Sequence, residues 1–224
     1  MEFRVIDLNQ LIIKFDYEKN FKDEDFYVSK SNKDAFEILN NWPKWEKKFL
    51  NIIGDKSSGK THLISIFIKK FKAIKLDAKF LSDEDVRKIK FYQNVILEDL
   101  NENVNEKLIY SLFNIIDIEN KYIIVTSDKS ITDINFSLKD LKSRTKNFIS
   151  QTIEKPNDEL IFALILKNLS DRQISIDAKL INFIIKRIGR SYGNISDFIY
   201  KIDELSLKKK KSIDFKLIKE VLGD

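Results

Sequence analysis

The chain has 224 residues, of which 43% are hydrophobic and 33% charged, with no cysteine and a single histidine, His62. This composition predicts a folded protein and excludes disulfides, cysteine nucleophiles and thiolate metal sites. The net charge is +5, but only six of the 40 cationic residues are arginines, so sequence-specific DNA binding is not expected. The sequence has neither an apolar run long enough to cross a membrane nor a signal-peptide pattern, which predicts a cytoplasmic protein without membrane contact.

Helices and strands are expected to alternate along the first two thirds of the chain. Ser31 or Asn32 is a candidate cap for a helix that ends near Trp42-Pro43, and a short buried strand runs into Gly54. Alternation of this kind predicts an α/β fold, with a parallel sheet flanked by helices on both faces. The remaining expected elements are strands over 73–76, 94–97 and 122–126, a helix from about Lys60, and a helix over 106–118.

The pattern changes after Gln151-Thr152-Ile153. Pro156-Asn157-Asp158-Glu159 is a strong helix start, and three or four amphipathic helices follow without a strand. We therefore expect an N-terminal segment over 1–22, an α/β domain over 23–155 and a small, all-helical subdomain over 156–224. The lysine run at 208–211 is expected to form an exposed turn between helices.

The most specific motif is a phosphate-loop pattern between the strand that ends near Ile53 and the helix that follows. In such a loop, successive backbone N–H groups surround phosphates at a helix N-terminus, whose dipole favours negative charge. Lys60 is expected to reach the β- and γ-phosphates, and Thr61 to ligate Mg²⁺. The motif consists of Gly54, Asp55, Lys56, Ser57, Ser58, Gly59, Lys60 and Thr61. The sequence thus predicts a nucleotide-binding site.

Two acidic residues, Glu98 and Asp99, follow the predicted strand over 94–97. An acid at that position orients Mg²⁺ and its waters, and a second acid can polarise an attacking water. Neighbouring strand residues point to opposite faces, so both acids can serve the site only if the strand ends there. The alternative is a strand that simply ends in acidic residues.

Two further candidates lie later in the α/β domain. Asp128 follows the predicted strand over 122–126, where a polar side chain would sit beside the γ-phosphate and the attacking water. The alternative is a turn or cap made by Ser127 and Asp128. Arg144 lies on a polar segment before the helical subdomain, where it can act as an arginine finger across a subunit interface or form a surface salt bridge.

These motifs, in this order, resemble the DnaA-type AAA+ ATPases, and in particular the short regulatory proteins of the Hda kind. The segment Phe26-Tyr27-Val28 with Ser31-Asn32 and Ala35 resembles the family's adenine-side segment, which implies that Val28 and Asn32 contact the nucleotide. The phosphate loop continued through His62 resembles Walker A, and Glu98-Asp99 resembles Walker B. Thr126-Ser127-Asp128 resembles sensor 1, and 138–144 resembles the segment with the arginine finger. The resemblance implies an AAA+ core, a helical lid, and ADP or ATP with Mg²⁺ as ligands.

Two departures from the family pattern concern catalysis. The metal-side acid is Glu98, where the family usually has aspartate. Ser196 occupies the position of the family's sensor 2 arginine in the lid, and Arg190 lies six residues earlier, so on a helix it faces elsewhere unless a loop at Gly193 redirects it. Loss of that cation predicts weak γ-phosphate sensing. Binding of ADP or ATP is therefore better supported than hydrolysis.

The N-terminal segment contains a further motif that resembles the Hda-like proteins. Gln10-Leu11-Ile12-Ile13 resembles the peptide with which they bind the β sliding clamp, in which Leu11 and Ile13 would enter an apolar groove and Gln10 would bond at its rim. The alternative is a strand that packs on the α/β core.

With no expected helix-turn-helix domain after the lid, the resemblance implies a regulator that is tethered to the clamp and promotes hydrolysis of ATP on the initiator DnaA. A helicase loader, a stand-alone ATPase and a nucleotide-stabilised scaffold are the alternatives. Homo-oligomerisation stays open.

Overall fold

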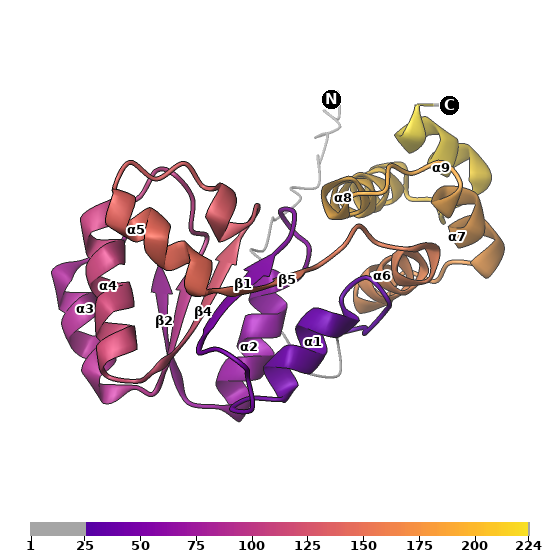
Figure 1. Cartoon of the computed structure of the whole chain (residues 1–224). Coiled ribbons are helices and arrows are strands. Elements are labelled where there is room, and N and C mark those ends of the chain that lie inside the picture. The colour runs from indigo at the N-terminus through magenta and orange to yellow at the C-terminus, as the bar shows by residue number, and fades with distance from the viewer. Residues whose placement is uncertain (1–25, 224) are drawn as a thin grey trace, which may run out of the picture.

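A computed structural model describes residues 26–223 of the chain. Its centre is a five-stranded parallel sheet with the order β2-β3-β4-β1-β5 (Figure 1). The strands are β1 (Phe49–Ile53), β2 (Ala73–Asp77), β3 (Asn94–Glu98), β4 (Tyr122–Ser127) and β5 (Ile149–Thr152). Because all five run in one direction, the loops after β1, β3 and β4 meet at a single edge, the carboxyl edge of the sheet.

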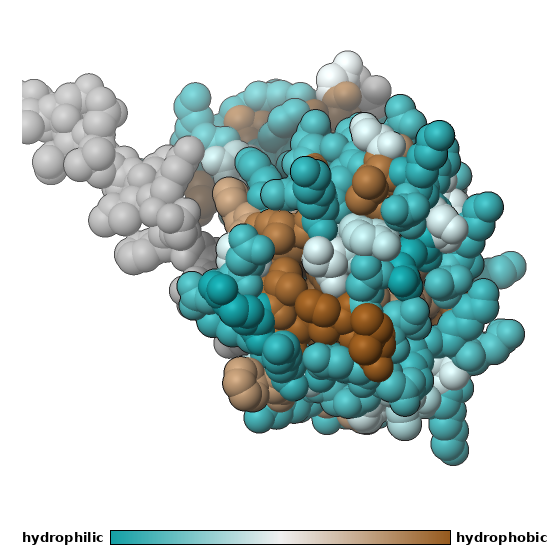
Figure 2. Space-filling view, turned by 60° about the vertical axis from the view of Figure 1, so that its left-hand side comes forward, coloured by the Kyte–Doolittle hydropathy of each residue, from teal (hydrophilic) through white to brown (hydrophobic). Residues whose placement is uncertain are grey.

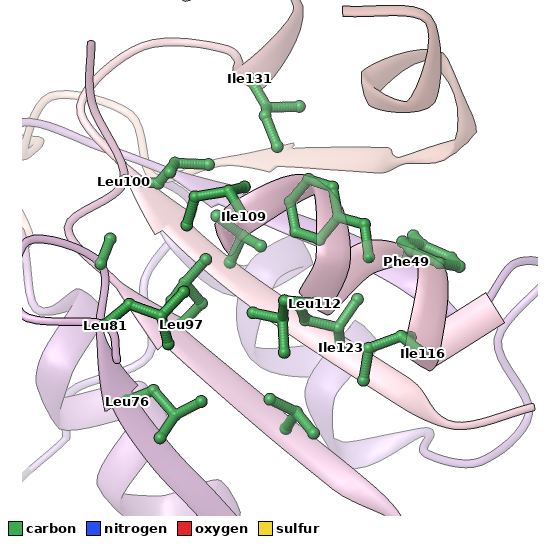
Figure 3. Close-up of a cluster of buried hydrophobic side chains, with 14 of the residues drawn as sticks. Phe49, Leu76, Leu81, Leu97, Leu100, Ile109, Leu112, Ile116, Ile123 and Ile131 are labelled. Atoms are coloured by element: carbon green, nitrogen blue, oxygen red, sulfur yellow. The ribbon is translucent and has the colours of Figure 1, made fainter. Parts of the chain in front are cut away.

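Helices cover both faces of this sheet, which confirms the predicted α/β fold. On one face, α1 (Lys33–Asn40) and α2 (Lys60–Lys70) bury Leu39, Leu63 and Phe67 against Leu50 and Ile52 of β1. On the other face, α3 (Asp83–Lys88), α4 (Glu106–Ile118) and α5 (Lys139–Arg144) enclose a second apolar cluster. Figure 3 shows this cluster, in which Ile109, Leu112 and Ile116 of α4 pack on Leu97, Ile123 and their neighbours.

Four helices follow the sheet and share a core of their own. They are α6 (Asp158–Asp171), α7 (Ala178–Ile185), α8 (Tyr192–Lys209) and α9 (Phe215–Leu222). Ile161, Ile181, Ile199 and Ile218, one from each helix, lie in this core. Two residues of the helical part, Leu160 and Tyr192, pack instead into the cluster under α1 and α2. The helical part therefore contacts the sheet domain on the side of the phosphate loop.

The expected strands and long helices are confirmed, but some local expectations hold only in part. Asn32 is the N-cap residue of α1, yet its side chain makes no cap bond, because its Oδ1 accepts from the Ser29 N–H instead. The lysine run is exposed, as expected, but Lys208 and Lys209 still belong to α8, and only Lys210 and Lys211 lie in the turn before α9. Gly193 lies within α8 and not in a loop, whereas Arg190 lies before that helix, in the connection between α7 and α8. The domain boundary at 155 stays a prediction.

The described surface has a few strongly exposed apolar side chains. Phe91 and Ile118, at 82% and 81% exposure, lie on the side of the sheet that α3 and α4 cover. Figure 2, in which this side is turned forward, shows an apolar stretch between hydrophilic residues. A recess of about 300 Å³ beside Lys47, Lys48 and Asn120 lies at the opposite edge from the phosphate loop. No helix within 26–223 is long and apolar enough to cross a membrane.

Candidate functional site

The phosphate-loop residues form a turn between β1 and α2 at the carboxyl edge of the sheet. Ser57 and Gly59 both have positive φ, at 67° and 95°, and Gly59 is the N-cap of α2 without any side chain to cap the helix. The first N–H groups of a helix have no partner within the helix. They are available to an anion, and the helix dipole favours one.

Gly54 is required by close approach within this loop. A Cβ atom on Gly54 would lie 2.5 Å from Ser58 Oγ. Ser58 is buried, and its hydroxyl has no hydrogen-bond partner among the described residues. A buried hydroxyl without a partner is costly, so this oxygen is suited to meet a polar ligand.

Lys60 lies at the centre of the loop with its ammonium group held by oxygen atoms. Lys60 is 7% exposed, and its Nζ donates to the Gly54 carbonyl, to the Asp55 carbonyl at 3.1 Å and to Asp128 Oδ1 at 2.8 Å. The Asp128 side chain is 73% exposed. An incoming phosphate oxygen can therefore replace the Asp128 carboxylate as the partner of Lys60.

The turn after β4 brings Asp128 to Lys60. Ser127 Oγ accepts from Asn51 Nδ2 at 2.8 Å and donates to the Lys129 carbonyl at 2.7 Å. Asn51 Oδ1 accepts in turn from the Ile131 N–H. Ser127 therefore makes a turn, as the alternative for this segment predicted. Asp128 instead contacts Lys60 of the phosphate loop.

The two acids after β3 have different surroundings. Glu98 is the last residue of β3 and is 7% exposed, whereas Asp99 is exposed and adopts a φ of 56°. Lys75 Nζ lies 2.5 Å from Glu98 Oε2, and Glu98 Oε1 is buried without a partner among the described residues. The Asp99 N–H donates to Thr126 Oγ1 at 3.0 Å. The strand does end at these acids, as their joint use requires, and Lys75 is a neighbour that sequence reasoning missed.

An aromatic side chain closes the other side of the phosphate loop. The Phe26 ring makes an edge contact with His62, at 5.2 Å between centroids, and stacks on Phe36 at 5.8 Å. A Cβ atom on Gly59 would lie 3.5 Å from Phe26 Cε2. His62 is thus beside Phe26 at the loop. Phe26 belongs to the segment that resembles the adenine-side motif, but no sequence pattern favours it over Val28.

Asn32 and Val28 have distinct positions in that segment. Asn32 is buried and bridges the backbone, since its Nδ2 donates to the Tyr27 carbonyl at 3.0 Å and its Oδ1 accepts from the Ser29 N–H at 2.8 Å. The Val28 side chain is 40% exposed. Asn32 therefore holds the shape of the segment, and Val28 is free to contact a ligand.

Tyr192, the first residue of α8, links the helical part to the phosphate loop. Its hydroxyl donates to the Glu154 carbonyl at 3.1 Å, and the residue is 6% exposed. Burial raises the pKa of Tyr192 to about 12, and the negative charges of Asp55 and Glu154 add to the effect. Ser196 is exposed one turn further along α8, and Arg190 pairs with Asp158 at 2.7 Å. The candidate sensor 2 positions are thus a neutral serine and an arginine already paired with α6.

No family model matches this chain, but known proteins do. It is 26% identical over 237 residues to the chromosomal replication initiator protein DnaA of Borrelia turicatae, which covers 92% of this chain and 49% of that protein. Domain III of DnaA from Thermotoga maritima superposes with a TM-score of 0.75 at 18% identity, over 92% of this chain and 97% of that one. The chain is thus similar to DnaA in sequence over nearly its whole length, and it has the fold of DnaA domain III.

Two further proteins are also similar to this chain. An uncharacterised protein of Haemophilus influenzae is 24% identical over 213 residues, covering 89% of this chain and 92% of that protein. AMPPCP-bound DnaA from Aquifex aeolicus superposes with a TM-score of 0.67 at 19% identity, over 86% of this chain and 70% of that one. The chain spans about half the length of the curated DnaA relatives that it matches.

Arg144 is the last residue of α5, and its side chain folds back on α4. Its Nη1 lies 2.8 Å from Asp117 Oδ2, and its guanidinium stands 5.8 Å from the centre of the Tyr110 ring. The side chain is 27% exposed. The surface salt bridge considered as an alternative is thus present, and Arg144 lies apart from the phosphate loop of its own chain.

The residues present fit a magnesium ion that arrives with a nucleotide. Thr61 is exposed as the second residue of α2, and the orphaned Glu98 Oε1 offers a buried acceptor. Within 26–223, no group of three His, Cys, Asp or Glu side chains is arranged to hold a metal by itself. Mg²⁺ commonly takes one or two protein ligands and completes its shell with phosphates and water. The predicted clamp-binding residues Gln10, Leu11 and Ile13 lie outside the described residues.

Proposed function

We propose that the chain binds ADP or ATP at the phosphate loop, with the base beside Phe26, Val28 and His62. The observation that carries the proposal is the buried Lys60 ammonium at the N-terminus of α2, held in place by an exposed and replaceable carboxylate, Asp128. The loop backbone from Gly54 to Gly59 would surround the phosphates. The nucleotide analogue held by the Aquifex DnaA supports this choice of ligand.

In this proposal, different residues bind the metal, the phosphates and the attacking water. Thr61 and Glu98 would hold Mg²⁺, which supplies positive charge to the phosphate oxygens when bound. Lys60 binds the β- and γ-phosphates. Asp99 orients an attacking water. Asp128, once a phosphate oxygen has displaced it from Lys60, responds to the γ-phosphate. Ser196 adds no positive charge from the lid, which favours slow turnover and stable binding.

We also propose that the chain regulates replication initiation by acting on the initiator DnaA. Its similarity to DnaA supports a role in the same process. In this proposal Arg144 acts in trans and promotes hydrolysis of ATP held by DnaA. The pair between Arg144 and Asp117 must open first, which is feasible because pairs with both partners partly exposed are weak. Gln10, Leu11 and Ile13 would tether the chain to the sliding clamp in the cytoplasm.

The experiment mixes the chain with clamp-loaded DNA and ATP-bound DnaA and measures released phosphate. We expect faster release, and we expect Arg144→Ala to abolish the increase. Arg172→Ala is the matched control, because Arg172 also makes a surface ion pair, with Asp203. Stimulation that survives Arg144→Ala, or its absence with the unchanged chain, contradicts the regulatory role.

A separate variant tests the tether. Gln10→Ala combined with Leu11→Ala should remove clamp binding in a pull-down while ADP binding stays unchanged. Unaltered clamp binding by this variant contradicts the tether without affecting the nucleotide site.

A further inference from the structure

Lys75 and Glu98 come together through the register of two neighbouring strands. In the β2–β3 pair, Lys75 lies opposite Ile96 and Asp77 lies opposite Glu98. Lys75 and Glu98 are therefore diagonal neighbours on one face, where long side chains can meet. Their charged atoms are 2.5 Å apart. Lys75 thus reaches the proposed metal-side acid from the strand at the edge of the sheet.

The burial of the two partners is unequal. The Glu98 side chain is 9% exposed, whereas that of Lys75 is 45% exposed. A buried carboxylate needs a compensating charge, and breaking such a pair by removing one partner leaves an uncompensated charge. Lys75 can move into solvent at little cost because its chain is long and its ammonium is already partly hydrated. Glu98 is the fixed member of the pair and Lys75 the replaceable one.

We propose that Lys75 is an internal counter-ion that stands in for Mg²⁺ at Glu98, so that the site binds ADP with little dependence on the metal. This inference rests on the proposed nucleotide site and adds a residue that controls its metal requirement. Without Lys75, metal-free phosphates would approach a bare and buried carboxylate and be repelled. With Lys75 in place, the buried charge of Glu98 is already compensated. When Mg²⁺ arrives, the ammonium withdraws toward solvent.

The test measures the dissociation constant of ADP in Mg²⁺ and again in excess EDTA. The ratio used below is the value in EDTA divided by the value in Mg²⁺. We expect a ratio below about 5 for the unchanged chain, because Lys75 replaces most of the metal's effect. Lys75→Met should raise this ratio by about 10-fold, mainly through weaker binding in EDTA. Lys79→Met is the matched control and should leave it unchanged, since Lys79 follows β2 on the surface and its Nζ lies 5.2 Å from the Phe80 ring centre.

Two variants at Glu98 complete the cycle. Lys75→Met combined with Glu98→Gln should return the ratio to within twofold of the unchanged chain, because no bare carboxylate remains. Glu98→Gln alone should strengthen ADP binding in EDTA, since Lys75 then adds an uncompensated positive charge. This variant keeps the test decisive even if Lys75→Met does not fold.

Two results overturn the inference. They are a Lys75→Met ratio within twofold of the unchanged chain, and unchanged or weaker ADP binding in EDTA for Glu98→Gln. Failure of the proposed nucleotide site is distinguishable, because the unchanged chain would then show no ADP binding in either buffer.

Discussion

The two ion pairs at the carboxyl edge of the sheet differ in which partner is buried: the cation in one and the acid in the other. In the pair after β4, the cation Lys60 is buried at 7% exposure and the acid Asp128 is 73% exposed. In the pair after β3, the acid Glu98 is buried at 9% exposure and the cation Lys75 is 45% exposed. Each pair has one fixed member and one that can leave.

This difference indicates which ligand group belongs at each end of the site. The exposed carboxylate occupies the place of an anion, as expected where a phosphate would bind Lys60. The exposed ammonium occupies the place of a cation, as expected where a metal would approach Glu98. Each of the two buried charges has a partner before any ligand arrives, so neither is left uncompensated.

The largest effect should come from removing the buried cation. We expect Lys60→Ala to weaken ADP binding by about 10- to 100-fold, because hydrogen bonds to charged groups contribute about 1.5–3 kcal/mol. Calorimetric titration with ADP measures the change, and Lys79→Ala serves as the control. Affinity within a factor of two of the unchanged chain would show that Lys60 does not bind the phosphates.

The next largest effect is expected at Tyr192, which is buried near Asp55 but, unlike the two ion pairs, is uncharged. Its pKa is raised from 10.0 to about 12 in the folded chain, so the unfolded chain loses this proton first as pH rises. Stability supported by the neutral phenol is complete below pH 10 and is lost between pH 10 and 12, by on the order of 2 kcal/mol.

Tyr192→Phe cannot ionise, so the variant should lose less stability than the unchanged chain over that range. Urea unfolding at pH 9, 10 and 11 measures this, with pH 9 giving the cost of losing the hydrogen bond to Glu154. Parallel declines in the two proteins would contradict the pKa assignment.

A smaller effect, of opposite sign to that of Lys60→Ala, is expected at the exposed acid. Asp128→Asn removes the carboxylate that competes with phosphate for Lys60, so ADP should bind about 2- to 5-fold more tightly. The same titration measures it. Weaker binding would mean that Asp128 supports the ligand directly and does not merely hold its place.

The smallest effect is expected for a pair in which neither partner is buried. Asp117→Asn releases Arg144, and the two side chains are 54% and 27% exposed. The free energy of unfolding in urea should change by no more than about 0.5 kcal/mol. A loss above about 2 kcal/mol would show that this pair, too, is a structural element of the fold.

Much of the fold could be predicted because its signals are local. The apolar run of β1 and the Gly54–Thr61 motif identify a strand, a loop and a helix within a single stretch of sequence. β5 was missed because Ile149–Thr152 is only four residues long and contains a single apolar residue, Ile149. α3 was missed although Ser82 and Asp85 form a capping box, since six residues give no helical period.

The site could be predicted only as far as its motifs reach. Gly59, Lys60, Glu98 and Asp128 lie at the same edge of the sheet because parallel strands end together. Their partners depend on contacts between distant segments: Lys75 on the β2–β3 register, and Asp117 on the packing of α4 against α5. Tyr192 reaches Glu154 only because α8 docks on the sheet domain.

A crystal structure of the chain with ADP and Mg²⁺ tests the central claim most directly. The claim predicts that both pairs open. The distance from Lys60 Nζ to Asp128 Oδ1 is now 2.8 Å, and that from Lys75 Nζ to Glu98 Oε2 is now 2.5 Å. Both distances should exceed about 4 Å in the complex. Lys60 should then contact the β-phosphate. Nucleotide bound in the loop with both pairs intact would contradict the claim that each exposed partner holds the place of a ligand group.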